Sequence, residues 1–131
     1  MSKTFALLVS GSPHQSQAHL SAQRFVEACY AKGHNISCVF FYGDAVYVAN
    51  GLMHPANDEQ HPHRQWRQLA ERFKFTLNAC VSVSSKRGVL NQEDSQLAGF
   101  TQHNVDKPFE ISGLGAWVEA SINADRTLHF A

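Results

Sequence analysis

Runs of apolar residues alternate with segments of helical periodicity along the 131-residue chain. Residues Thr4–Ser10 and Ile36–Tyr42 are almost continuously apolar, which is typical of strands buried on both faces. Between them, His19–Lys32 places apolar residues at helical spacing, and Gly33 follows at a position where glycine commonly ends helices. A strand, a helix and a second strand in this order predict a parallel sheet with a crossover helix.

The same alternation continues to the end of the chain. We expect further helices over Gly43–Asn50, His63–Phe73, Asn91–Gly99 and Gly115–Asn123, and further strands over Phe75–Val83, in the short segment FEIS from Phe109, and over Thr127–Phe130. Leu97 and Ala98 are the expected apolar contacts of the third of these helices. The pattern predicts one α/β domain over residues 1–131, with a mostly parallel sheet of about five strands flanked by helices.

Residues 51–63 (GLMHPANDEQHPH) interrupt this pattern with two prolines, polar side chains and little periodicity. Loops of about a dozen residues inside compact domains are often functional or face a partner. His54, His61 and His63 share this loop and raise the alternative of a metal site. Because zinc needs three or four ligands on a rigid framework, we expect a solvated loop and no bound metal.

Composition restricts the classes of function. Eleven basic and eleven acidic residues cancel, so the chain lacks the positive charge that neutralises nucleic-acid phosphates. The apolar run Phe5–Val9 is too short for a membrane span or a signal-peptide core, so we expect a cytoplasmic protein with no membrane contact. Only 17% of residues are charged, and Val46, Tyr47 and Val48 adjoin the long loop, which favours burial against partner proteins.

The three cysteines are odd in number and include no C-x-x-C pair, so we treat them as separate thiols. Cys29 lies on the apolar stripe of the first helix and Cys38 lies in the middle of a strand, so both are expected in the core. Cys80 lies near the carboxyl end of a strand, and in parallel sheets this end lines the functional crevice.

Small residues and a basic pair follow Cys80. If Ser82–Ser85 begin a helix, its free N–H groups together with Lys86 and Arg87 favour a thiolate over a thiol with a pKa of about 8.5, and the small side chains leave the sulfur accessible. A buried structural cysteine remains an alternative on residue type alone. A Cys–His hydrolase is a further alternative, although no histidine has a sequence context that pairs it with Cys80.

Two glycine-containing segments raise the alternative of an anion-binding loop. Residues 10–17 (SGSPHQSQ) follow the first strand, where a phosphate loop would lie, but they lack the spacing and the lysine of that motif. Residues Ser112–Gly115 (SGLG) are interpreted as the start of a helix. We therefore expect no bound nucleotide and no other organic cofactor.

Three segments together resemble the DsrE-like sulfurtransferases, and the resemblance extends over nearly the whole chain. They are GHNISCVFFYGDAVYVAN (Gly33–Asn50), LNACVSVSSKRGV (Leu77–Val89) and SGLGAWVEASINADRTLHF (Ser112–Phe130). The resemblance implies that Cys80 carries a persulfide and that Lys86 and Arg87 occupy the place of a basic pair that is usually two arginines. The lysine retains the charge but lacks the planar fork of arginine. The family also tends to have glycine at the position of Ala45.

The resemblance further implies a place in the relay that delivers sulfur for 2-thiolation of the wobble uridine of transfer RNA. Its implied partners are two related subunits in a heterohexamer, an upstream sulfur carrier and a downstream sulfur acceptor. No metal or organic cofactor is implied. The alternative within the same fold is a non-catalytic scaffold or binding subunit in which Cys80 is incidental.

Overall fold

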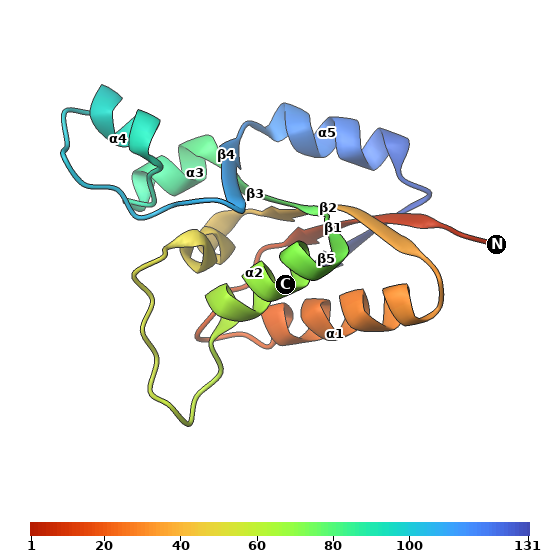
Figure 1. Ribbon diagram of the computed structural model, residues 1–131. Helices are drawn as coiled ribbons and strands as arrows, with labels where there is room; N and C mark the ends of the chain where they lie inside the picture. The colour runs from red at the N-terminus through yellow and green to blue at the C-terminus, as the bar shows by residue number, and fades with distance from the viewer.

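Five parallel strands form one sheet in the order β4-β3-β2-β1-β5 in the computed structural model, which describes residues 1–131 (Figure 1). The strands are β1 (Thr4–Val9), β2 (Asn35–Phe41), β3 (Thr76–Cys80), β4 (Phe109–Ser112) and β5 (Arg126–Phe130). Every neighbouring pair is parallel, so the predicted α/β fold with five strands is confirmed.

Helices lie on both faces of the sheet and beyond its carboxyl edge. They are α1 (Ala18–Ala31), the 3-10 helix η1 (Gly43–Ala49), α2 (Pro62–Phe73), α3 (Val81–Lys86), α4 (Gln92–Leu97) and α5 (Leu114–Asn123). In Figure 1, α1 and α2 cover one face and α5 covers the other, while α3 and α4 lie at the end of the sheet where β3 stops. None of these helices has the length and apolar content needed to cross a membrane.

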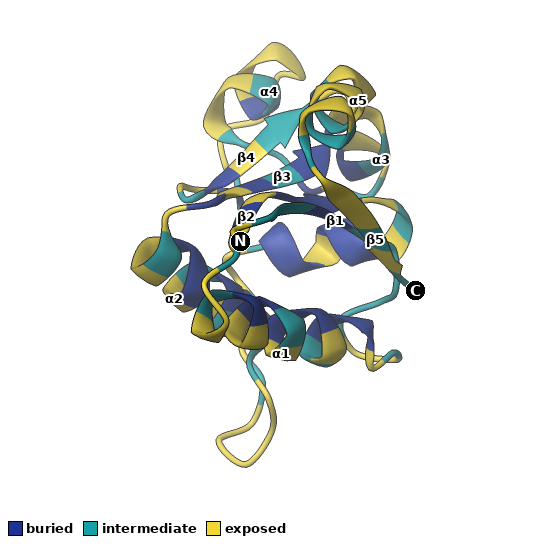
Figure 2. Cartoon of the chain, turned by 90° about the vertical axis from the view of Figure 1, so that its right-hand side faces the viewer, coloured by how far each residue is buried: buried dark blue, intermediate teal, exposed yellow.

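The two faces of the sheet differ in how thoroughly they are covered. Alternate strand residues such as Val39 and Leu77 belong to a large core of 22 buried residues beneath α1 and α2. The residues between them face α5 and form a small cluster of Cys38, Phe40 and Cys80. No residue of α5 is fully buried, and Figure 2 shows this helix in exposed and intermediate colours. The α5 face is therefore the thinner layer of the fold.

Two expectations at the level of single elements are wrong. Strand β3 stops at Cys80, and the predicted strand residues Val81–Val83 begin α3 instead, so the serine-rich segment is helical. Leu97 is 80% exposed and Ala98 is also exposed, because Ser95 is the residue that α4 buries. These differences arise because a short element takes its buried side from its neighbours, which periodicity does not describe.

The segment around the long loop also differs from expectation. Val46 and Val48 are fully buried in η1 and belong to the main core, so they do not form an uncovered apolar surface. Only Tyr47 between them is exposed. Residues 51–61 themselves are largely exposed and extend away from the helices as a long connection to α2 (Figures 1 and 2).

Candidate functional site at the carboxyl edge of the sheet

The carboxyl ends of β3 and β4 place two residues side by side at one edge. Cys80 is the last residue of β3 and the N-cap of α3, and Ser112 is the last residue of β4, one residue before the N-cap Gly113 of α5. Cys80 and Ser112 are partners in the parallel ladder. The edge at which open parallel sheets bind their ligands therefore carries a thiol and a hydroxyl on adjacent strands.

Cys80 is enclosed by apolar side chains. Only 2% of the residue is exposed, and its cluster with Cys38 and Phe40 is covered by Leu8, Val83 and three residues of α5, namely Ala116, Trp117 and Ala120. The nearest polar partner of its sulfur is the Ser82 hydroxyl, with 3.7 Å between Sγ and Oγ. The expectation that small residues leave the sulfur accessible is wrong for the isolated chain, because α5 lies across it.

The two basic residues after Cys80 occupy different surroundings. The Arg87 guanidinium is ion-paired with Asp44 at 2.9 Å and also donates to the carbonyl oxygen of Val83 at 3.2 Å. Lys86 is exposed in the last turn of α3 and has no ion-pair partner. Neither side chain hydrogen-bonds the Cys80 thiol, so the structure brings them to the same short helix as the sulfur but not into contact with it.

A hollow of about 490 Å³ adjoins this edge along β4. Asn78, Glu110 and Ser112 contribute to its lining from the strand face that also carries Cys80, and Asn91, Asp106 and Lys107 contribute from the connection that precedes β4. Three of its lining residues, Glu93, Asp106 and Glu110, are acidic and one, Lys107, is basic. The hollow is therefore a polar and mildly acidic approach beside the buried thiol.

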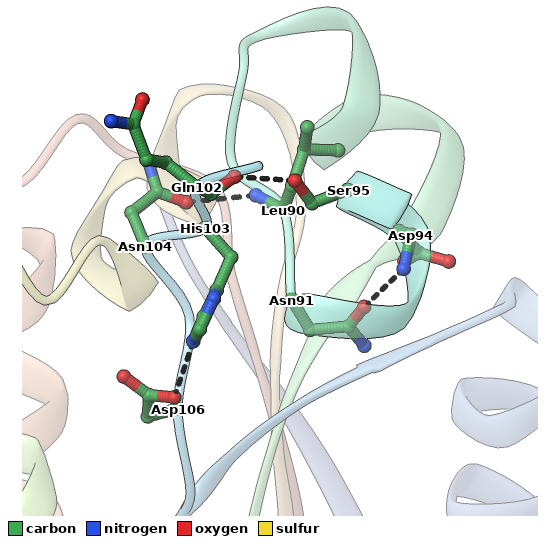
Figure 3. A network of polar contacts seen from close by, with 8 residues as sticks. All are labelled: Leu90, Asn91, Asp94, Ser95, Gln102, His103, Asn104 and Asp106. Atoms are coloured by element: carbon green, nitrogen blue, oxygen red, sulfur yellow. Dashed lines mark hydrogen bonds and ion pairs between the residues drawn. The ribbon is translucent and has the colours of Figure 1, made fainter. Parts of the chain in front are cut away.

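Short-range hydrogen bonds link residues of the connection that precedes β4 (Figure 3), and two of these residues, Asn91 and Asp106, line the hollow. The Asn91 side chain caps α4 by accepting from the Asp94 amide at 2.8 Å, and the Asn104 side chain accepts from the Leu90 amide at 2.8 Å. Ser95 donates to the carbonyl oxygen of Gln102, and His103 bonds Asp106 at 2.9 Å. Because these bonds tie residues 90–106 to one another, the connection holds a defined shape beside β4.

The other two cysteines are core residues, as predicted. Cys29 and Cys38 are each 4% exposed, and burial raises the pKa of both thiols. For Cys38 this is partly opposed by hydrogen bonds with Thr76 and Asn78, the latter at 3.4 Å from the Asn78 Nδ2 atom to the sulfur. Both residues are therefore unsuited to nucleophilic attack at neutral pH.

His61 and His63 of the long loop have separate structural partners. His61 caps α2 by accepting from the Arg64 amide, and His63 is buried with its Nδ1 atom 2.7 Å from the carbonyl oxygen of Val48. Burial is the main cause that lowers the pKa of His63. No group of three or more His, Cys, Asp or Glu side chains is placed to hold a metal ion, and no histidine hydrogen-bonds Cys80.

Three residues of this site escaped the sequence analysis. Asp44 was considered only as part of a helix start, yet it pairs with Arg87 across the edge. Trp117 was not recognised as a cover for the cysteine cluster, and Ser112 was interpreted only as the start of a helix. The sequence does indicate that the segments LNAC and FEIS are strands that end at Cys80 and Ser112. That these two residues are neighbours depends on the strand order, which the sequence does not give.

Comparison with known proteins now places the fold. The model of the DsrE/DsrF-like family matches residues 3–130. The chain belongs to this family. Among solved structures, the ychN protein from E. coli matches with a TM-score of 0.77 and 15% sequence identity, over 98% of this chain and 99% of that one. At this identity the likeness concerns the fold alone, and it is the same DsrE-like arrangement of a parallel sheet between helices. The DsrE-like family is generally involved in sulfur relay, and its members are related to sulfurtransferases.

Proposed function

We propose that this chain is a sulfurtransferase subunit of a sulfur relay, in which Cys80 takes up sulfur as a persulfide and passes it to another protein. The observation that carries the proposal is the position of Cys80 at the junction of β3 and α3, on the carboxyl edge of a DsrE-like sheet. Cys29 lies inside α1, Cys38 lies in the middle of β2, and burial raises the pKa of both thiols, which leaves Cys80, at a strand end and a helix start, as the candidate carrier.

The transfer needs no cofactor, because sulfur itself is the group that moves. The Cys80 thiolate attacks the outer sulfur of a donor persulfide, forming a new S–S bond while the donor's S–S bond breaks and its electron pair leaves on the donor thiolate. An acceptor thiolate then attacks the outer sulfur on Cys80 in the same way. Each step conserves the number of S–S bonds, so neither an oxidant nor a reductant is required.

Lys86 and Arg87 are assigned to holding negative charge near the sulfur. Lys86 is the free cation of α3, since Arg87 already faces Asp44. The Lys86 side chain is long and flexible and carries a point charge, so it can follow a sulfur whose position changes during transfer. Arg87 contributes by fixing α3 to η1 through its bonds to Asp44 and Val83.

The finer assignment is to the relay for 2-thiolation of the wobble uridine of transfer RNA. The three segments noted in the sequence resemble TusD, a subunit of the relay that makes 2-thiouridine. We accordingly assign as partners two related subunits in a heterohexamer, an upstream carrier and a downstream acceptor, and a cytoplasmic location. The equal numbers of acidic and basic residues support contact with proteins rather than with the RNA.

A second candidate is a scaffold subunit of the same fold with no transfer activity. The observation that favours it is the 2% exposure of Cys80 beneath α5. A thiol in this position reacts only when the cover moves. The two candidates differ in whether Cys80 ever carries an additional sulfur.

Mass spectrometry after incubation with a sulfide-mobilising desulfurase and the upstream carrier distinguishes the two. We expect one additional sulfur on the peptide that contains Cys80, and its loss in Cys80→Ser, which changes the volume little but removes a group able to ionise near neutral pH. Cys29→Ser and Cys38→Ser are the matched controls and should retain the sulfur on Cys80. No gain on Cys80 in the wild type would favour the scaffold subunit.

A further inference from the structure

Two buried hydroxyls in the molecule have no hydrogen-bond partner. They are the side chains of Ser84, in the middle of α3, and Ser112, at the end of β4. A buried polar group without a partner destabilises a fold, and native structures contain few of them. Ser84 is fully buried and does not line the hollow along β4, whereas Ser112 does line it. The Ser112 hydroxyl is therefore available to a group that enters beside β4.

The register of the sheet places Ser112 directly next to Cys80. The two residues are partners in the parallel ladder, and partners in a ladder point to the same face. That face is the one covered by α5, because Phe109 and Ile111 of β4 pack on the opposite, larger core. Adjacent strands are about 4.8 Å apart, and the Ser112 hydroxyl makes no hydrogen bond with the bare thiol, so a longer side chain on Cys80 is needed to reach it.

A persulfide is the side chain that spans this gap. Adding one sulfur to Cys80 extends it by an S–S bond of about 2.0 Å. The outer sulfur carries negative charge once its proton is lost to water, and the immediate surroundings of Cys80 are apolar, from Phe40, Val83 and Trp117. A buried charge requires a hydrogen-bond donor, and a serine hydroxyl supplies one.

We propose that Ser112 binds the transferred sulfur: its hydroxyl donates a hydrogen bond to the outer sulfur of the Cys80 persulfide and so retains that sulfur on Cys80 between its uptake and its release. The inference rests on the proposed function of Cys80 and adds the group that holds the transferred atom. When the Cys80 thiolate takes the outer sulfur from a donor persulfide R–S–SH, the products are Cys80–S–SH and R–S⁻. Loss of the remaining proton to water gives the anion that Ser112 binds, and Ser112 keeps its own proton throughout.

The role of Ser112 differs from that of Ser82. The Ser82 hydroxyl lies 3.7 Å from Sγ of the bare thiol, so it contacts the sulfur that stays on the protein. Ser112 lies across the ladder and lines the hollow along β4, which is where a donor or acceptor thiol would meet the outer sulfur once α5 moves. The hydrogen bond from Ser112 thus holds the outer sulfur of the Cys80 persulfide on the side that faces the hollow.

The test uses glutathione persulfide as the sulfur donor and the full chain. Peptide mass spectrometry follows the additional sulfur on Cys80 and its removal by a fixed concentration of dithiothreitol, over a range of pH. Because a hydrogen bond to a charged group stabilises the persulfide anion, we expect Ser112→Ala to lose the sulfur at least about tenfold faster than the wild type. The pH midpoint for alkylation of the persulfide should rise, while alkylation of the sulfur-free Cys80 thiol stays unchanged.

Three further variants separate the hydroxyl from its structural surroundings. Ser112→Thr keeps a hydroxyl and should retain slow loss, whereas Ser112→Val has nearly the same shape without the hydroxyl and should lose sulfur as fast as Ser112→Ala. The comparison of Ser112→Thr with Ser112→Val tests the role of the hydroxyl even if the alanine variant is unstable. Ser84→Ala removes the other unpartnered buried hydroxyl and should behave as the wild type.

The possible failures are distinct. If the wild type takes up sulfur on Cys80 and Ser112→Ala and Ser112→Val release it at the wild-type rate, Ser112 has no role and the proposed function stands. If Cys80 takes up no sulfur in the wild type, both proposals are overturned. An equal acceleration in Ser84→Ala would also overturn the role of Ser112, because it would show a general loss of packing.

Discussion

His19 is held between two partners that fix which of its ring nitrogens carries the proton. The indole N–H of Trp66 can only donate, so the Nδ1 atom of His19 accepts from it at 3.0 Å. The Nε2 atom therefore bears the hydrogen and donates to the carbonyl oxygen of Gly11 at 2.8 Å. This neutral ring joins the turn after β1, the start of α1 and the middle of α2. A second proton would have to face the Trp66 donor.

The stability of the fold should depend on pH through His19. Burial lowers its pKa from 6.5 to about 4, partly opposed by the bond to Gly11 and assisted by His14. Since the folded state disfavours the charged ring, the stabilisation is fully present above pH 6.5 and is lost as the pH falls through about 4. The difference corresponds to about 3 kcal/mol of the free energy of unfolding.

Urea unfolding between pH 4 and pH 8 measures this loss. The wild type should become less stable over the lower part of the range, and His63, whose pKa is also lowered by burial, should act in the same direction. The variant His19→Gln can still accept from Trp66 and donate to Gly11 but has no proton to gain, so its stability should change less with pH. The same slope in both proteins would show that His19 does not control it.

The two basic residues after Cys80 differ in whether their charge is paired. Arg87 is partly buried and its partner Asp44 is more exposed, so the two offset each other near the start of η1. Lys86 is the residue of the pair whose charge is not matched by a neighbour. In the proposed function, Lys86 therefore acts by its charge alone and does not need the planar fork of arginine.

At the scale of elements, α5 controls access to the cysteine. It packs on the cluster through Ala116, Trp117 and Ala120, and the Trp117 ring lies 6.2 Å from that of Phe40 between centroids. The opposite side of the helix carries Leu114, Val118 and Ile122, which are exposed at a spacing of four residues. One side of α5 is half-buried and the other is exposed, so the helix is weakly fixed to the sheet. Elements with few buried contacts are the ones that open locally.

Removing the Trp117 ring should therefore make Cys80 more reactive. Trp117→Ala takes away most of the cover, which favours local opening by on the order of 1–2 kcal/mol. We expect iodoacetamide to alkylate Cys80 roughly tenfold faster, since 1.4 kcal/mol corresponds to a factor of ten. Peptide mass spectrometry at pH 7 gives the rate.

Ile122→Ala is the matched control for this change. Ile122 lies on the same helix but is 75% exposed, so its truncation should leave the alkylation of Cys80 at the wild-type rate. Equal rates in the wild type and Trp117→Ala would mean that the thiol is reached by a route that does not involve α5.

The elements also show how far the sequence could be interpreted. Apolar runs and helical spacing predicted all five strands and the flanking helices, because long buried elements carry their own pattern. Cys80 was located at a strand end for the same reason. The cover by Trp117 and the pairing with Ser112 were missed, since both depend on strand order and on where α5 crosses the sheet. Val81 was misassigned because a β-branched residue beside a strand continues its pattern.

At the scale of the molecule, exposed apolar side chains remain on two surfaces. One is the outer side of α5, with Leu114, Val118 and Ile122. The other is α4 and the residues after it, where Leu97 and Phe100 are exposed. The equal numbers of acidic and basic residues give the chain little repulsion to keep copies apart. Both features fit the proposed heterohexamer better than a free monomer.

We therefore expect the chain to associate unless this apolar side of α5 is covered. Expressed without the two related subunits, it should be poorly soluble or self-associated, and co-expression should yield a larger hetero-oligomer, since obligate interfaces commonly bury over roughly 2,000 Å² and are apolar. Introducing charge by Val118→Lys with Ile122→Lys should disrupt that assembly in sedimentation experiments, because both side chains point away from the sheet. Gln68→Lys, at an exposed polar position of α2, adds charge away from both apolar surfaces and should leave assembly intact. The opposite result would be a wild-type chain that sediments as a monomer, forms no complex on co-expression and still transfers sulfur from Cys80. It would contradict the need for partners, and α5 would then serve only as a cover for the thiol.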